Sequence, residues 1–65
     1  MMGKLKFFNK NIGYGLIKTK TIEGRIFVHI SDLPSNLKVG SMVEFRLITN
    51  QKGYQAIEVK SIQKH

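Results

Sequence analysis

The run from Arg25 to Ile30 contains the side chains with the clearest chemical potential in this 65-residue sequence. Successive residues of a β-strand point to opposite faces, so this run separates into two sets with a period of two. One set is wholly aliphatic and predicts a core face: Ile26, Val28 and Ile30. The other set places a cation, a phenyl ring and an imidazole in a row, namely Arg25, Phe27 and His29.

A second run, Gly13-Tyr14-Gly15-Leu16-Ile17, has the same kind of alternation. Tyr14 and Leu16 share one of its faces. If the two runs pair as a hairpin, these two residues join Phe27 and His29 in a single exposed patch of flat or apolar groups. Exposed clusters of this kind usually mark a binding surface.

Catalytic and metal-binding chemistry find little support in the sequence. His29, Ser31 and Asp32 are the residue types of a catalytic triad, but they lie together at one strand end, and triads are built by geometry rather than by sequence proximity. The four acidic residues form no recognisable acid–base pair. The other histidine is the terminal His65 and there is no cysteine. We expect no catalytic residue, no metal and no cofactor.

The charge balance favours a polyanionic partner. Eleven Lys and Arg residues against four Asp and Glu residues give a formal net charge of +7. Such an excess is typical of proteins that bind nucleic acid or anionic membranes. A membrane-surface protein would need a basic amphipathic helix, and no helical period is present. No apolar run approaches the roughly 20 residues of a membrane span, and no secretory signal is recognised. We expect nucleic acid as partner, without a membrane or small-molecule substrate, in a cytoplasmic protein.

The elements that must position these residues are short strands. Alternating segments bounded by turn residues predict strands over residues 3–9, 13–19, 25–30, 42–49 and 54–62. The adjacent rings of Phe7 and Phe8 predict a bulge in the first strand. Residues 31–40, which include Pro34, read as a loop with room for one helical turn. We predict one all-β domain over residues 1–65, a five-stranded antiparallel barrel of the oligonucleotide-binding (OB) type, with an SH3-like barrel as the main alternative.

Four stretches resemble the bacterial cold-shock protein family, and the similarity extends over nearly the whole chain. They are Gly3-Lys4-Leu5-Lys6-Phe7-Phe8-Asn9, Gly13-Tyr14-Gly15-Leu16-Ile17, Ile26-Phe27-Val28-His29-Ile30-Ser31 and Gly53-Tyr54-Gln55-Ala56. The two central stretches correspond to the family's RNA-binding motifs, and the last resembles the Gly-Pro-Gln-Ala that opens its final strand. The resemblance implies an OB-like barrel that binds single-stranded RNA or DNA through stacked bases. It also implies a nucleic-acid chaperone that works without ATP.

The resemblance assigns roles by position. Phe7 takes a tryptophan position and Tyr14 a phenylalanine position, whereas Phe27 and His29 match outright. Lys6 and Asn9 match polar contact positions, and Lys52 takes a basic turn position. With Leu16 from the exposed patch, Arg25 from the charge pattern and Gln55 from the last motif, the predicted nucleic-acid-binding residues are Lys6, Phe7, Asn9, Tyr14, Leu16, Arg25, Phe27, His29, Lys52 and Gln55.

Several positions depart from the family pattern. Leu16 and Ile30 replace aromatic residues, and the loop after Ser31 is shorter and lacks a Gly-Phe-Lys segment. Arg25 replaces an acidic residue, whereas Ile12 replaces a lysine. We interpret these changes as an exchange of aromatic stacking for electrostatic attraction in a monomeric protein. The alternative hypothesis is a basic OB or SH3-like module that docks on structured RNA or on a protein partner.

Overall fold

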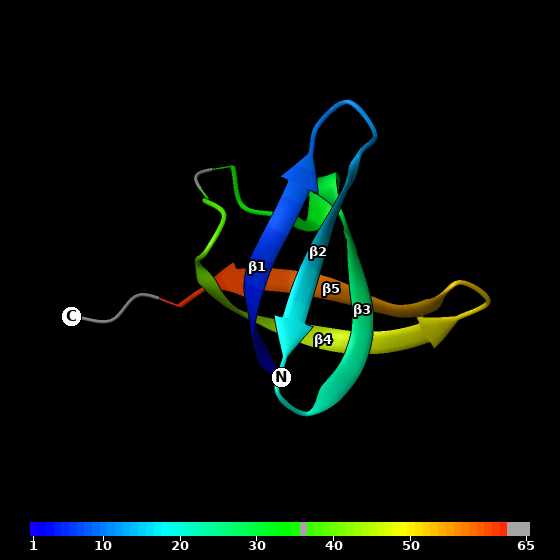
Figure 1. The fold of residues 1–65 in the computed structure, drawn as a ribbon. Helices are drawn as coiled ribbons and strands as arrows, with labels where there is room; N and C mark the ends of the chain where they lie inside the picture. Colours follow the sequence, from blue (N-terminus) through cyan, green and yellow to red (C-terminus); the bar gives the residue numbers. More distant parts are fainter. Residues whose placement is uncertain (36, 63–65) are drawn as a thin grey trace.

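The computed structural model describes residues 1–35 and 37–62, which form a closed five-stranded barrel (Figure 1). The predicted domain of residues 1–65 also includes residues 36 and 63–65, which lie outside the described residues. The elements in chain order are β1 (Met2–Asn9), β2 (Tyr14–Thr19), β3 (Ile22–His29), a 3₁₀ turn η1 (Ile30–Asp32), β4 (Met42–Asn50) and β5 (Gly53–Ser61). The predicted all-β barrel is confirmed.

The strands follow the order β1-β2-β3-β5-β4, and β1 closes the barrel by pairing with β4. In Figure 1 the β1–β2–β3 meander crosses in front of the β4–β5 hairpin, whose turn projects to one side. Every pairing is antiparallel except that of β3 with β5, which is parallel. Closure removes free sheet edges, which suits a chain with so small a core.

The barrel interior is filled by the aliphatic half of each alternating strand. Ile26 and Val28 are fully buried, as the period of two predicted. Their neighbours in the core come from all the other strands and from the loop before β4: Leu5, Ile17, Leu37, Val43, Phe45, Ala56 and Val59. Burying a side chain of this size stabilises the fold by about 1.5–3 kcal/mol, so this set provides the main stabilisation.

An irregularity in β1 turns Phe7 outward and Phe8 inward. Leu5 pairs with Ile17, but Phe7 pairs with Leu16, so one extra residue of β1 lies between the two pairs. Phe7 is therefore exposed on the outer surface, whereas Phe8 packs against the core. The bulge predicted from the adjacent rings is confirmed.

Close contact between β1 and β2 requires glycine at position 15. A Cβ atom added to Gly15 would lie 2.7 Å from the carbonyl oxygen of Phe7 and 2.9 Å from Cβ of Phe8. Such distances are shorter than van der Waals contact, so a larger residue would push the strands apart. Gly15 thus brings the outer side chains of β2 beside those of β1.

The bounds of β3 differ from the prediction. The strand begins at Ile22 rather than at Arg25, because Ile22 pairs with Thr19 and packs against the core. It ends at His29, and the backbone N–H of Ile30 donates to the carbonyl of Gly13 at 2.8 Å as the chain enters η1. The prediction that Ile30 continues the core face was wrong, because the 3₁₀ turn leaves its side chain only half-buried at the surface.

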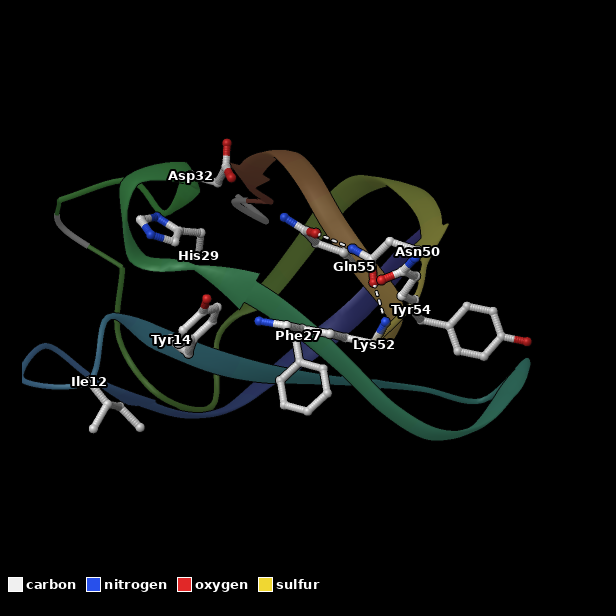
Figure 2. Close-up of a pocket in the computed structure, with 10 residues that line it drawn as sticks. Ile12, Tyr14, Phe27, His29, Asp32, Asn50, Lys52, Tyr54 and Gln55 are labelled. Carbon is white, nitrogen blue, oxygen red and sulfur yellow. Dashed lines mark hydrogen bonds between the residues drawn. The ribbon is translucent and has the colours of Figure 1, made fainter.

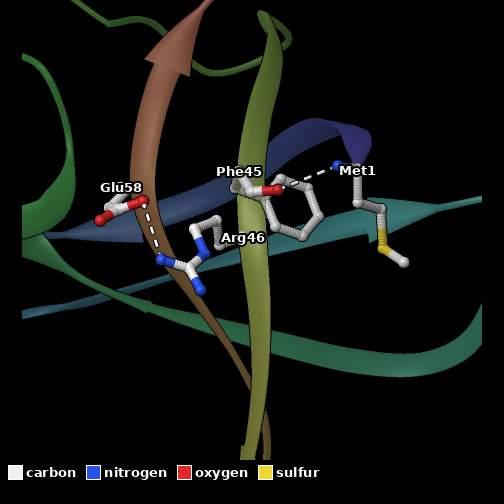
Figure 3. Close-up of polar contacts among 4 residues, drawn as sticks. All are labelled: Met1, Phe45, Arg46 and Glu58. Carbon is white, nitrogen blue, oxygen red and sulfur yellow. Dashed lines mark hydrogen bonds and ion pairs between the residues drawn. The ribbon is translucent and has the colours of Figure 1, made fainter.

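Polar contacts join β4 to the N-terminal residue and to β5 (Figure 3). The amino group of Met1 donates to the carbonyl of Phe45 at 3.0 Å, and the N–H of Phe45 donates to the carbonyl of Met1 at 2.8 Å. Arg46 and Glu58 form an ion pair at 3.5 Å, and both side chains are exposed. Exposed pairs contribute about 0–1 kcal/mol, so this one is a minor contact. Within residues 1–35 and 37–62, no helix is both long and apolar enough to cross a membrane.

Candidate functional site

The outer surface of β1, β2 and β3 presents side chains in rows that run across the strands. Strand register places Leu16 opposite Phe7 on one side and opposite Phe27 on the other. The next row pairs Tyr14 with His29. We call these five residues, Phe7, Tyr14, Leu16, Phe27 and His29, the aromatic face.

The aromatic face is accessible to a ligand. Phe7 retains 44% and Tyr14 40% of their maximal exposure, His29 is also exposed, and Phe27 is half-buried. The rings of Tyr14 and His29 meet edge to face, with centroids 5.5 Å apart and planes at 80°. This arrangement is a favourable one for two aromatic rings, so each helps to orient the other.

An open depression of about 920 Å³ includes part of the aromatic face and extends from it to the β4–β5 hairpin (Figure 2). Ordinary ligand sites have volumes of about 300–1,000 Å³, so this one has room for more than a single base. Its lining comes from the β1–β2 turn, the outer side of β2 and β3, the 3₁₀ turn and the β4–β5 hairpin: Ile12, Tyr14, Phe27, His29, Asp32, Asn50, Gln51, Lys52, Tyr54 and Gln55. In Figure 2 the Lys52 side chain extends from the hairpin turn back across the depression.

Ser31 fixes the hydrogen-bonding state of His29. The backbone N–H of Ser31 donates to Nδ1 of His29 at 3.2 Å, and the Ser31 hydroxyl lies 2.7 Å from the same nitrogen. Because a backbone N–H can only donate, Nδ1 is an acceptor and the ring proton lies on Nε2. His29 therefore presents an N–H donor on the side of its ring away from Ser31.

A basic row borders the aromatic face at the other end of these strands. Lys4 of β1 lies directly opposite Lys18 of β2, and both are exposed on the outer surface. Arg25 of β3 is exposed as well, and it immediately precedes Ile26, whose partner Ile17 immediately precedes Lys18. We call Lys4, Lys18 and Arg25 the basic row. None has a carboxylate partner in the described part of the chain.

The depression brings together half of the predicted binding residues. Tyr14, Phe27, His29, Lys52 and Gln55 all line it.

The other predicted residues lie around the depression. Phe7 and Leu16 adjoin it as members of the aromatic face, whereas Arg25 belongs to the basic row. Lys6 is exposed at the bulge of β1. Asn9 lies opposite Tyr14, but its side-chain oxygen accepts from the N–H of Asn11 at 2.8 Å, so this atom serves the turn.

Other residues at the site were not predicted from sequence. Ile12, Asp32, Asn50, Gln51 and Tyr54 line the depression through turns whose shape no period of two reveals. Lys4 and Lys18 could have been found, because both stand at outward positions of their predicted strands. The described residues contain no group of three or more His, Cys, Asp or Glu side chains that could hold a metal ion.

Comparison with known proteins gives one consistent family. Residues 1–62 match the family described as 'Cold-shock' DNA-binding domain. A "Cold shock-like protein" of Thermotoga maritima is 42% identical over 67 residues, covering 97% of this chain and 100% of the relative. "Cold shock-like protein CspC" of Escherichia coli K12 is 36% identical, covering 92% of this chain and 93% of the relative.

Among solved structures, drosophila Unr CSD456 superimposes with a TM-score of 0.77 over 95% of this chain. The identity is 23% and the match spans 26% of that longer chain, so this likeness concerns the fold.

Proposed function

This chain belongs to the cold-shock domain family, a family of nucleic-acid-binding domains, and from that premise we propose that it binds single-stranded RNA or DNA through the aromatic face. The observation that carries the proposal is a row of flat and apolar side chains, Phe7, Leu16 and Phe27, exposed beside the Tyr14–His29 pair. Strand surfaces that expose apolar rings to water are otherwise unfavourable, and a stacked base would cover them.

Base stacking accounts for a preference for unpaired strands. Every base has two π faces, and stacking on an aromatic side chain contributes about 1–3 kcal/mol per base with little demand on sequence. In a duplex these faces already stack on neighbouring base pairs and are not available. The rings of Phe7, Tyr14 and Phe27 therefore select strands whose bases are free.

The cations around the aromatic face supply attraction for the phosphates. Lys52 reaches across the depression from the β4–β5 hairpin, and the basic row borders the aromatic face at the other end of β1, β2 and β3. Like charges directly opposite one another on a sheet destabilise it, so the Lys4–Lys18 pair is unfavourable in the free protein. A phosphate between these side chains removes that repulsion and releases counterions from the nucleic acid.

Selective binding of unpaired strands is sufficient for chaperone activity. A protein that binds the open form of a hairpin and not its closed form shifts the equilibrium toward the open form by mass action, without ATP or a catalysed reaction. We propose that the chain acts in this way as a monomer in the cytoplasm.

An RNA hairpin labelled with a fluorophore and a quencher tests this proposal. Addition of the protein alone, without nucleotide, should raise the fluorescence as the stem opens, and a fully complementary duplex of equal length should not compete well. The Phe27→Ala variant should open the hairpin only at higher protein concentration. If the protein binds the hairpin and leaves the stem closed, docking on structured RNA is the better description.

A further inference from the structure

We propose that the basic row is a docking site for a base-paired stem, so that the protein binds where an unpaired strand continues into a duplex. In this arrangement the aromatic face holds the unpaired bases, and the basic row contacts the phosphates of the adjoining stem. The inference rests on the proposed function, because the aromatic face supplies the single-strand half of the site.

The basic row continues the aromatic face along the same strands. Lys18 follows Leu16 by two residues on β2, and Arg25 precedes Phe27 by two residues on β3. Successive outward side chains of a strand are about 7 Å apart, so a ligand that covers the rings also reaches the row. In Figure 1 the start of β1 and the end of β2, which carry Lys4 and Lys18, lie together beside the β2–β3 turn.

The sheet neighbours of the basic row include no aromatic side chain on β1 or β4. Lys4 lies between Lys18 and Met42 in the strand register. An unpaired base over these side chains would have no ring to stack on, whereas the bases of a stem already stack on one another and present phosphates to a partner. The chemistry of the row therefore suits a stem better than a free strand.

The density of positive charge in the row also favours a duplex. Lys4 and Lys18 are directly opposite each other, at positions whose Cβ atoms are about 4.5–5.5 Å apart, and neither has a carboxylate partner among the described residues. A duplex carries one negative charge per about 1.7 Å of its axis, against about 3.4 Å for each of its strands. Two cations held this close gain most from a ligand that presents phosphates of two strands.

The surroundings of the row reinforce this charge. Lys20, in the β2–β3 turn, is exposed at the same end of the strands. Glu23 is the only acidic residue in residues 1–30, and it forms no ion pair in the described part of the chain. A protein held by this end at the base of a stem has its aromatic face next to the terminal base pair. Bases released when that pair opens then meet the rings directly.

A DNA duplex with a single-stranded tail tests the inference. The two strands of a short G·C duplex are covalently cross-linked so that the stem cannot open, and one strand continues as an oligo-dT tail of about six nucleotides, a length within the site sizes of OB folds. The tail is attached at the 3′ end in one ligand and at the 5′ end in another, because a strand bound in one direction brings the stem to only one side of the rings. The tail alone and the blunt cross-linked duplex complete the set.

At one moderate salt concentration, one of the two tailed duplexes should bind more tightly than the tail alone. Two exposed ion contacts raise affinity by about three- to tenfold, which is the gain expected from the stem. Lys18→Gln should reduce this gain by about two- to threefold, because it weakens binding of the tailed duplex more than binding of the tail. Lys60→Gln is the matched control, since it makes the same change in charge at an exposed position of β5 opposite Glu44 and should leave the gain unchanged.

Three results would count against these expectations. If neither tailed duplex binds more tightly than the tail alone, the basic row does not dock a stem. If Lys18→Gln weakens the tail and the tailed duplex by the same factor, the row serves the single strand itself and the inference is overturned. If the tail alone binds no more tightly than the blunt duplex, the proposed function is wrong, and any gain from the stem reflects adsorption by charge.

Discussion

At the scale of single residues, Phe27 is the centre of the account. It lies between Leu16 on β2 and Gln55 on β5, and its ring lines the depression while its neighbours Ile26 and Val28 are fully buried. The backbone of Phe27 is therefore fixed in β3, whereas its ring lies on the outer surface of the barrel.

The Phe27→Ala variant should therefore separate the contribution of base stacking to the binding affinity from that of electrostatic attraction. We expect a loss of about 1–3 kcal/mol in single-strand binding, because one stacking platform is removed. The dependence of affinity on salt should not change, because no phosphate contact is lost. Titrations at several salt concentrations measure both quantities. Unfolding of the variant at room temperature would show that Phe27 is a core residue and contradict the assignment.

Leu16 offers the opposite test, a gain of stacking surface. It is half-buried between Phe7 and Phe27, so a ring at this position would connect two aromatic residues into a continuous row. Leu16→Phe should tighten oligo-dT binding by about 0.5–1 kcal/mol, since leucine already provides apolar contact. Val39→Phe, at an exposed position in the loop before β4 and outside the depression, is the control and should have no effect. Unchanged oligo-dT binding by folded Leu16→Phe would place Leu16 outside the interface.

At the scale of elements, the approach of β1 to β2 determines whether the aromatic face exists at all. Gly15→Ala places a Cβ against the Phe7 carbonyl and should destabilise the fold by about 1–3 kcal/mol, the range for overpacked sites. Urea unfolding measures this loss. Gly3→Ala is a suitable comparison, because its Cβ would lie 2.7 Å from the Lys18 carbonyl, away from the aromatic face.

The two glycine variants should differ in binding. Under conditions where both are folded, Gly15→Ala should weaken single-strand binding more than Gly3→Ala, because only the former displaces Phe7 from Leu16. Equal binding by the two variants would mean that the spacing of these strands does not matter to the ligand.

The strands were easier to predict from the sequence than the turns. The alternation in residues 25–30 was enough to separate Phe27 from the core, because two faces with different partners impose a strict period of two. The same rule failed at Ile30, whose N–H donates to the carbonyl of Gly13 and whose carbonyl accepts from the N–H of Leu33, which closes a 3₁₀ turn. It also could not reveal the hydrogen bond from Nδ2 of Asn50 to Oε1 of Gln55, which joins the two strands of the β4–β5 hairpin. The alternation of residue types along a strand indicates which face of the sheet each side chain occupies, whereas the shape of a turn depends on hydrogen bonds between specific atoms.

The local sequence pattern could not predict which strands pair with each other either. Five short strands with turn signals were sufficient to predict a barrel, but the parallel contact of β3 with β5 joins segments on either side of a loop without periodicity. That contact is what brings Gln55 beside Phe27. The part of the site built by neighbouring strands was therefore predictable, and the part contributed by the β4–β5 hairpin was available only through family resemblance.

At the scale of the whole molecule, a net charge of +7 on 65 residues makes electrostatics a large part of binding. If about three to five phosphates are neutralised, the logarithm of affinity should fall with the logarithm of salt concentration with a slope of roughly −2 to −3.5. A slope near zero would contradict the exchange of stacking for charge.

The basic row should account for part of that slope. Lys18→Gln should reduce its magnitude by about one unit or less, because one phosphate contact is removed. Lys60→Gln is the control, since Lys60 lies opposite Glu44 on the β4–β5 hairpin, away from the basic row. Equal effects of the two substitutions would show that the charges act through the overall field rather than through the basic row.

The most direct test of the central claim is a comparison of paired and unpaired strands read out by Tyr14. The chain has two tyrosines and no tryptophan, so Tyr54→Phe leaves Tyr14 as the sole source of tyrosine fluorescence. Oligo-dT and a duplex of equal charge are titrated at the same moderate salt concentration. Recognition by stacking predicts that oligo-dT quenches Tyr14 and binds at least about tenfold more tightly than the duplex. Equal affinities, with no quenching of Tyr14, would mean that the protein adsorbs nucleic acid by charge alone and that the aromatic face is not its binding surface.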